Sequence, residues 1–289
     1  MRLVTFEHQG RQSVGVLVDD QVVEIGDGRQ SMLDVIEAGE SAISDIKAIL
    51  QSAALRISVT EVTLMAPIPK PIRNILCVGR NYAEHVIEGN RNHDRPDEMP
   101  PTPTWFTKAT TSVCGPYDDL LLTATVSQKF DWEAELAIVI GTEGRNIAEQ
   151  EAMNYVHSLA VFNDVSARDI QHSYADQWFK GKSADRSSPF GPWLTVLDDS
   201  IDPTNLDITC RVNGITKQQS NTSLMMFDIP FLICDISRVM TLLPGDIIST
   251  GTPSGVGSGR TPREFLKDGD VLETEVETLG TLRNVCRTT

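Results

Sequence analysis

Short apolar stretches separated by turn residues dominate the first part of the chain. Residues 2–7 alternate between apolar and polar positions, and residues 13–18 and 21–25 form short, mostly apolar runs, which predicts three strands. Ser31 is placed to cap a helix, and a second helix is predicted near residues 43–51. This mixture predicts a small α/β unit at the N-terminus.

A proline-rich crossing separates this unit from the rest of the chain. Pro67, Pro69 and Pro71 restrict the backbone dihedrals and disfavour a helix, so this segment is predicted to be extended. We therefore place a domain boundary here, between a small N-terminal domain of residues 1–70 and a main domain of residues 71–289.

The main domain is richer in strand patterns than in helical ones. Helical spacing is clear at residues 148–154 and 229–240, and residues 81–88 are also predicted to be helical, before a proline-rich loop at 89–103. Many strands, few helices and no βαβ rhythm predict a β-rich α+β fold. The predicted strands are residues 74–78, 135–140, 158–162, 193–196, 206–212, 246–249 and 271–276.

Composition and charge exclude several classes of partner. The 289 residues include 25 Lys and Arg against 40 Asp and Glu, a net charge of −15, and no basic patch, so a nucleic-acid partner is not expected. No stretch approaches the roughly 20 apolar residues of a transmembrane helix, and no signal peptide is recognisable, so no membrane partner is expected. The five cysteines are scattered without a CxxC pair, which is typical of reduced thiols in a cytoplasmic protein.

Two glycine-containing segments imitate nucleotide-binding motifs. Gly181-Lys182-Ser183 resembles the end of a phosphate-binding loop, but Asp176 stands where that loop needs a glycine. Residues 255–259 read GxGxG instead of GxGxxG, and no βαβ unit surrounds them. GxSxG and HExxH are also absent from the sequence, so nucleotide binding, serine hydrolysis and zinc proteolysis are not predicted.

Carboxylates at the start of one predicted strand are the most informative feature. Glu133 and Glu135 share a face of the strand and run directly into apolar residues, while Asp164 follows the apolar run 159–162. A divalent cation would relieve the repulsion between such carboxylates, and the lack of a His or Cys pattern favours Mg²⁺ or Mn²⁺ over zinc. A solvent-facing charged strand edge, with Asp164 as a helix cap, remains an alternative at this point.

Several separated segments form one ordered set across residues 72 to about 285. The segments are residues 77–85, Glu133-x-Glu135, residues 163–169, Lys182-Ser183, and residues 191–193, 245–253, 255–257, 269–270 and 279–282. In this order they resemble the fumarylacetoacetate hydrolase family, and residues 1–70 also look like the small domain of its bacterial members.

The resemblance implies a site, a fold and an assembly. It implies a β-rich catalytic fold, a homodimer and a Mg²⁺ or Mn²⁺ ion held by Glu133, Glu135 and Asp164, whereas Asp131 on the same face is not assigned as a ligand. It further implies that a His85–Glu88 dyad on a lid helix activates water and that Lys182 holds developing negative charge. The spacing of His85 and Glu88 alone also fits an ordinary pair on a helix surface. Lys180 is the nearby alternative to Lys182. Arg168, Gln171 and Thr252 match family positions near the polar end of the substrate.

These features lead to an expected reaction on a small 2-oxo acid. We expect a divalent-metal-dependent hydrolase that cleaves a C–C bond in a 2,4-dioxo acid of the acylpyruvate type, releasing pyruvate and a carboxylic acid. An oxaloacetate-type decarboxylase or a 2-hydroxy-diene-dioate isomerase is the alternative, because the same site can stabilise the same enolate. An inactive ligand-binding homologue is a further alternative.

Overall fold

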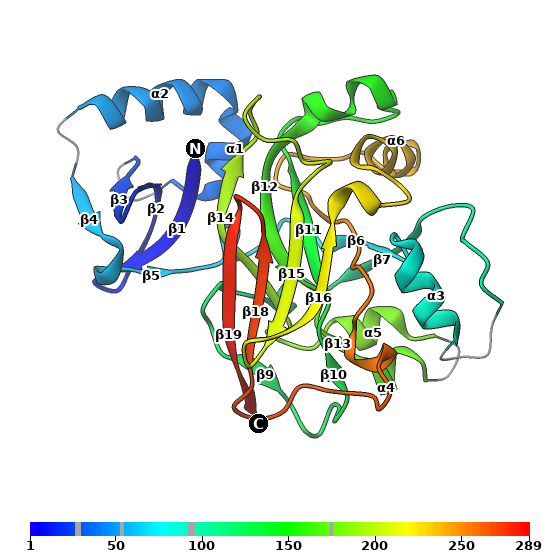
Figure 1. Ribbon diagram of the computed structural model, residues 1–289. Coiled ribbons are helices and arrows are strands. Elements are labelled where there is room, and N and C mark those ends of the chain that lie inside the picture. Colours follow the sequence, from blue (N-terminus) through cyan, green and yellow to red (C-terminus); the bar gives the residue numbers. More distant parts are fainter. Residues whose placement is uncertain (27–29, 53–54, 92–95, 174–175) are drawn as a thin grey trace.

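One mixed sheet of 12 strands runs through the N-terminal and the main part of the chain (Figure 1). The computed structural model describes residues 1–26, 30–52, 55–91, 96–173 and 176–289. The strand order is β4-β3-β2-β1-β14-β12-β11-β17-β6-β7, with β5 beside β1 and β8 beside β14. The strands are β1 (Arg2–His8), β2 (Arg11–Val18), β3 (Gln21–Glu24), β4 (Arg56–Ser58), β5 (Thr63–Leu64), β6 (Ile75–Gly79), β7 (Thr104–Lys108), β8 (Val113–Cys114), β11 (Ala134–Ile140), β12 (Val156–Asn163), β14 (Ser188–Val196) and β17 (Ile247–Ser249).

A second sheet of five strands packs on the main-domain part of the first. Its order is β16-β15-β18-β19-β9, and β10 pairs separately with β13. These strands are β9 (Leu120–Leu122), β10 (Phe130–Asp131), β13 (Ser166–Ala167), β15 (Asp207–Val212), β16 (Ile215–Asn221), β18 (Val271–Val276) and β19 (Gly280–Thr288). The helices are α1 (Met32–Ala38), α2 (Glu40–Gln51), α3 (Ala83–Arg91), α4 (Arg168–Gln171), α5 (Trp178–Lys182) and α6 (Ile229–Val239), with short 3-10 helices η1 (Val59–Glu61), η2 (Thr110–Ser112), η3 (Glu149–Tyr155), η4 (Thr222–Leu224) and η5 (Gly257–Gly259).

Both faces of β11 are covered, which explains its continuous apolar sequence. Leu136 and Ile138 pack into the core shared with the five-stranded sheet, whereas Ala137 and Val139 pack into the core shared with α1 and the N-terminal strands. Alternate residues of a strand point to opposite faces, so Glu133 and Glu135 follow the side of Ala137. The carboxylates are thereby placed on one side of the sheet, at the end of an otherwise apolar strand.

The predicted β-rich α+β fold is confirmed, with corrections in detail. Ser31 caps α1 with a reciprocal capping box to Asp34, as the helix-start pattern predicts. Residues 149–155 form a 3-10 helix, so the prediction of an α-helix there is wrong. The predicted loop at 89–103 begins later, because α3 continues to Arg91, and residues 92–95 lie outside the described residues. The N-terminal strands join the main sheet through Leu3, which pairs with Leu194, and the boundary at residue 70 stays a prediction.

Candidate active site

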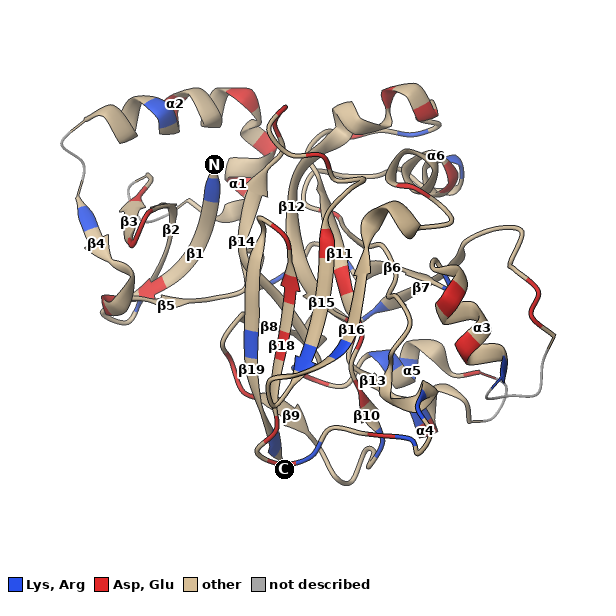
Figure 2. Ribbon diagram, in the orientation of Figure 1, with Lys and Arg blue, Asp and Glu red and all other residues tan. Residues whose placement is uncertain are grey.

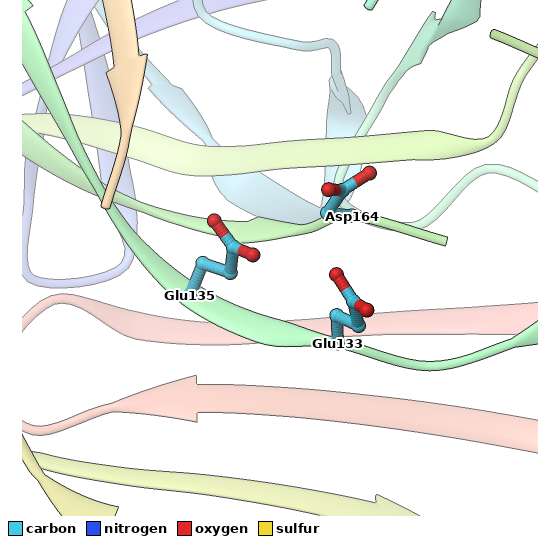
Figure 3. Close-up of side chains that lie close together, drawn as sticks. All are labelled: Glu133, Glu135 and Asp164. Atoms are coloured by element: carbon cyan, nitrogen blue, oxygen red, sulfur yellow. The ribbon is translucent and has the colours of Figure 1, made fainter. Parts of the chain in front are cut away.

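Three carboxylates meet at the end of β11 and β12. Glu133 precedes β11, Glu135 lies within it, and Asp164 follows β12, where its N–H donates a 2.9 Å hydrogen bond to the carbonyl of Glu133. One oxygen from each carboxylate lies within 4.8 Å of the others (Figure 3). The three residues are 4%, 1% and 0% exposed, which excludes a solvent-facing strand edge. Asp164 is not a helix cap either, because the N-cap of α4 is Ala167.

Lysines hold two of these carboxylates from inside the protein. The Lys182 ammonium lies 2.6 Å from Oε2 of Glu133 and 2.7 Å from Oδ2 of Asp164. Lys108, at the end of β7, donates to Oδ1 of Asp164 at 2.7 Å and to the carbonyls of Val165 and Ser187. Lys182 is 2% exposed and Lys108 is 0% exposed, whereas Lys180 is exposed. The structure therefore selects Lys182 over Lys180 as the lysine at the site.

Glu135 is held by neutral groups alone. Its Oε2 accepts hydrogen bonds from the Ser249 hydroxyl at 2.5 Å and from the Gly251 N–H at 2.9 Å. Burial, together with the negative charges of Asp164 and Glu133, raises the pKa of the Glu135 carboxyl well above its usual range. Burial also disfavours ionised Glu133, but the ammonium of Lys182 and the guanidinium of Arg168 outweigh it and lower the pKa of Glu133 to about 2.

The charge balance of this interior leaves room for a bound cation. Its buried cations are Lys108, Arg168 and Lys182, and its buried carboxylates are Asp131 and the three grouped ones, which leaves one negative charge in excess. Among the described residues, Glu135 is the one carboxylate of this group that forms no ion pair, and its Oε1 accepts no hydrogen bond. Three carboxylate oxygens in reach of one point, with no His or Cys among them, suit a hard ion such as Mg²⁺ or Mn²⁺.

The predicted His85–Glu88 pair lines a cavity that Glu133 and Glu135 also line. Both side chains come from α3, His85 Nδ1 lies 3.2 Å from Oε2 of Glu88, and each side chain is 17% exposed. The cavity has a volume of about 270 Å³ and is lined by both residues together with Glu133, Glu135 and Lys182. A shared cavity and partial burial distinguish this pair from an ordinary surface pair.

The GxGxG segment has a structural role beside this pair. The N–H of Gly255 donates to both oxygens of Glu88, at 3.1 and 3.2 Å. A Cβ atom at Gly259 would overlap the Glu88 carboxyl group, so the backbone there packs directly against the acid. The N–H groups of Gly257 and Ser258 donate to Asp131 at 2.6 and 2.9 Å. The segment thus holds two carboxylates by backbone donors, which sequence reasoning missed.

Residues predicted to contact the substrate are brought to the cavity but are engaged with the protein. Arg168 donates through Nε to Asp131 at 2.8 Å and through Nη1 to Gln171 at 2.9 Å, and its Nη2 lies 2.7 Å from Glu133. The Thr252 hydroxyl donates to the Ala134 carbonyl. Arg168, Gln171 and Thr252 line the cavity, and their contact with substrate stays a prediction.

Comparison with known proteins identifies the family. The family profile described as fumarylacetoacetate (FAA) hydrolase, C-terminal, matches residues 74–287. The chain belongs to the fumarylacetoacetate hydrolase family. Its resemblance at the level of motifs is therefore confirmed across the main part of the chain.

Relatives of known description extend this assignment. The chain is 42% identical over 255 residues to oxaloacetate tautomerase Fahd2a, mitochondrial, of Rattus norvegicus, covering 88% of this chain and 79% of that protein. It is 37% identical over 303 residues to oxaloacetate tautomerase YisK of Bacillus subtilis, covering 98% and 99%. The crystal structure of maleylpyruvate hydrolase from Sphingobium sp. SYK-6, in complex with manganese (II) ion and pyruvate, superimposes with a TM-score of 0.82 at 30% identity, covering 100% of this chain and 99% of that one. The fumarylacetoacetate-hydrolase-like fold is thereby confirmed over the full length.

Proposed function

We propose that this protein is a Mg²⁺- or Mn²⁺-dependent enzyme that interconverts the keto and enol forms of oxaloacetate or a closely related 2-oxo acid. The observation that carries the proposal is the buried group of Glu133, Glu135 and Asp164, because its two glutamates line a cavity that His85 also lines. The two relatives named above support the reaction, since both are named oxaloacetate tautomerases. They favour the alternative expectation, enolate chemistry without hydrolysis, over C–C bond cleavage by water.

The three carboxylates would hold the cation. When bound, a divalent ion supplies a Lewis acid that a 2-oxo acid can chelate and that makes the hydrogens on C3 more acidic. The all-oxygen donor set supports Mg²⁺ or Mn²⁺, and the manganese complex of the maleylpyruvate hydrolase supports the same choice. Lys108 fixes one oxygen of Asp164, so it holds this carboxylate in place for the ion.

His85 is the group proposed to move the proton. An imidazole can accept and return a proton, and Glu88, whose Oε2 lies 3.2 Å from Nδ1 of His85, orients the ring. His85 would take a proton from C3 and return it to the 2-oxo oxygen, which completes the tautomerisation. Lys182 and Arg168 add positive charge at the end of the cavity where the enolate forms. No carbon–carbon bond breaks and no water is consumed.

C–C hydrolysis remains a second candidate because of the same dyad. A water-activating pair is most useful in a hydrolase, and the chain is similar to a maleylpyruvate hydrolase over its full length. The identity to the tautomerases is higher, at 37–42% against 30%, so tautomerisation is the main proposal.

Three assays on one preparation separate these reactions. Decay of enol-oxaloacetate absorbance reports tautomerisation, and pyruvate release from oxaloacetate or acetylpyruvate reports decarboxylation or hydrolysis. Each is run with Mg²⁺, Mn²⁺ and EDTA. We expect metal-dependent enol decay that exceeds pyruvate release from either substrate and is lost in His85→Ala. Lys182→Met should lose it as well, while the matched Lys180→Met, on the exposed side of α5, should keep it.

Activity on acetylpyruvate alone would reverse the order of the two candidates. Enol decay at the uncatalysed rate, with metal bound, would contradict the proposal. Among the described residues, no helix is both long and apolar enough to cross a membrane. The homodimer and the cytoplasmic location stay predictions.

A further inference from the structure

The cavity wall carries unpaired positive charge in an otherwise acidic protein. The chain has a net charge of −15, yet Arg80, Lys129 and Arg263 all line the cavity that Glu133 and Glu135 also line. The side chains of these three residues form no hydrogen bond or ion pair with the described part of the chain. With 40 acidic residues available, three such cations around one cavity indicate a missing anion.

Nearby carboxylates do not fill this role. Asp169 and Asp176 also line the cavity, but Asp169 accepts a 2.5 Å hydrogen bond from the Ser127 hydroxyl, and Asp176 lies 3.7 Å from Nδ1 of His172. Blue cationic and red acidic segments lie together near α4 and the loop that passes it (Figure 2). The cations are therefore left for an external ligand.

Arg80 is the most constrained of the three cations. It follows the last residue of β6 with φ of 59°, in the left-handed region that non-glycine residues seldom adopt, and it is half-buried, whereas Lys129 and Arg263 are exposed. Asn81, the next residue, is fully buried and bonded through its side chain to the carbonyls of Thr250 and Phe227. Such backbone conformations persist where the surroundings enforce them, and they gather at ligand sites.

We propose that Arg80 binds a second carboxylate of the substrate, so that the natural substrates are dicarboxylic 2-oxo acids. This rests on the proposed function, which places the 2-oxo acid end at Glu133, Glu135 and Asp164. An arginine presents a planar pair of donors that matches a carboxylate, and partial burial reduces screening by solvent. The exposed Lys129 and Arg263 add a positive field at the mouth of the cavity, which attracts a dianion.

A charge-specific change in affinity tests the proposal. Arg80→Met should raise KM for oxaloacetate by about 10- to 100-fold, the usual cost of a lost charge-assisted hydrogen bond, and leave kcat within about twofold. The same variant should leave KM unchanged for acetylpyruvate, whose tail is uncharged. The KM of Arg80→Lys for oxaloacetate should lie between those of the wild type and Arg80→Met, because lysine keeps the charge without the planar pair of donors. Lys70→Met removes an exposed cation that does not line the cavity and should change neither constant.

A binding measurement keeps this test separate from turnover. Calorimetric titration of the Mg²⁺-loaded protein with L-malate and L-lactate compares a dicarboxylate with its monocarboxylate counterpart. We expect tighter binding of malate, and loss of that preference in Arg80→Met. If the wild type fails to tautomerise oxaloacetate but shows the Arg80-dependent preference, the proposed function is wrong and the subsite stands.

Three results would overturn the subsite. They are an unchanged KM for oxaloacetate in Arg80→Met, an equal rise of KM for both substrates, and equal binding of malate and lactate by the wild type. Thermal melts of each variant confirm that a changed constant does not come from unfolding.

Discussion

The two ends of the large sheet bury different kinds of side chain. Around β1 to β5, one core cluster consists of apolar residues such as Val4, Phe6 and Val22, and the buried polar side chains described between residues 1 and 64 are those of Thr5 and Ser13. The cavity end buries charged residues, each less than 9% exposed. They are Lys108, Asp131, Glu133, Glu135, Asp164, Arg168 and Lys182.

This difference separates what stabilises the fold from what gives it chemistry. Burying a charge costs free energy unless a partner compensates it, and at the cavity end Glu135 forms no ion pair with a described residue. The N-terminal end carries no such cost, so its apolar packing supports the sheet on which the carboxylates are mounted. Variants at the two ends should therefore fail in different assays.

Glu135→Gln should give the largest effect on activity. The change keeps the side chain's size and an oxygen for Ser249 and Gly251 but removes the charge. Weaker metal binding should lower metal-dependent activity by about 1000-fold or more, which corresponds to about 4 kcal/mol. Mn²⁺ titration and steady-state rates measure it, with the exposed Glu37→Gln of α1 as the matched control. Wild-type affinity and rate in Glu135→Gln would remove Glu135 from the ligand set.

Leu3→Ala should produce the opposite failure at the N-terminal end. Leu3 is fully buried, and truncation should lower the free energy of unfolding by about 3 kcal/mol through lost burial and a residual cavity. The rate per folded molecule and the Mn²⁺ affinity should stay unchanged. Denaturant unfolding measures the free energy of unfolding. The control Leu55→Ala, at a side chain 68% exposed, should lower it little. Loss of metal affinity in folded Leu3→Ala would show that the two ends are not separable.

Gly259→Ala should disturb the acid–base dyad without unfolding the protein. The added methyl overlaps Glu88, so the acid must move, and a displacement of this kind should lower kcat by about 100-fold. Gly89→Ala on α3 meets nothing within 4 Å and should leave kcat unchanged. Metal affinity should be the same in both variants. In a Glu88→Ala background, Gly259→Ala should cost almost nothing more, and a full additional loss there would show general damage instead of an effect through Glu88.

His157 provides the smallest and most pH-specific test. It lies buried in β12, its ring nitrogens have no hydrogen-bond partner, and burial lowers its pKa from 6.5 to about 4. Between these values the unfolded chain binds more protons, so stability falls as the pH is lowered through this window, by about 2 kcal/mol from pH 7 to pH 5. His157→Leu should flatten the dependence between pH 7 and 5, as followed by thermal melts. If His157→Leu keeps the same pH dependence of stability, that dependence comes from other groups.

The site could be predicted where its signal was local. Glu133 and Glu135 are two residues apart at the start of β11, and His85 and Glu88 are three apart on a helix, so periodicity places each pair on one face. Asp164 was a candidate because it follows the apolar run 159–162, and the family segments supported it and supplied Lys182. The strand patterns likewise predicted β11, β12 and β18 with small errors at their ends.

What the sequence did not reveal depends on long-range contacts. Lys108 is a single lysine in a short strand, and nothing near it in the sequence shows that Asp164 is its partner, 56 residues away. The GxGxG segment was excluded as a nucleotide-binding motif, yet its role depends on Glu88 and Asp131, which approach it only in the folded chain. The pairing of β1 with β14 was missed for the same reason.

The most direct measurement follows enol-oxaloacetate decay while Mn²⁺ is titrated into metal-free protein and bound Mn²⁺ is counted by electron paramagnetic resonance in the same samples. The rate should rise in proportion to bound Mn²⁺ and saturate at one ion per chain, with neither binding nor rate enhancement in Glu135→Gln. A rate that is fully present before Mn²⁺ binds, or that ignores its occupancy, would contradict the claim that the buried carboxylates are the metal centre of this enzyme.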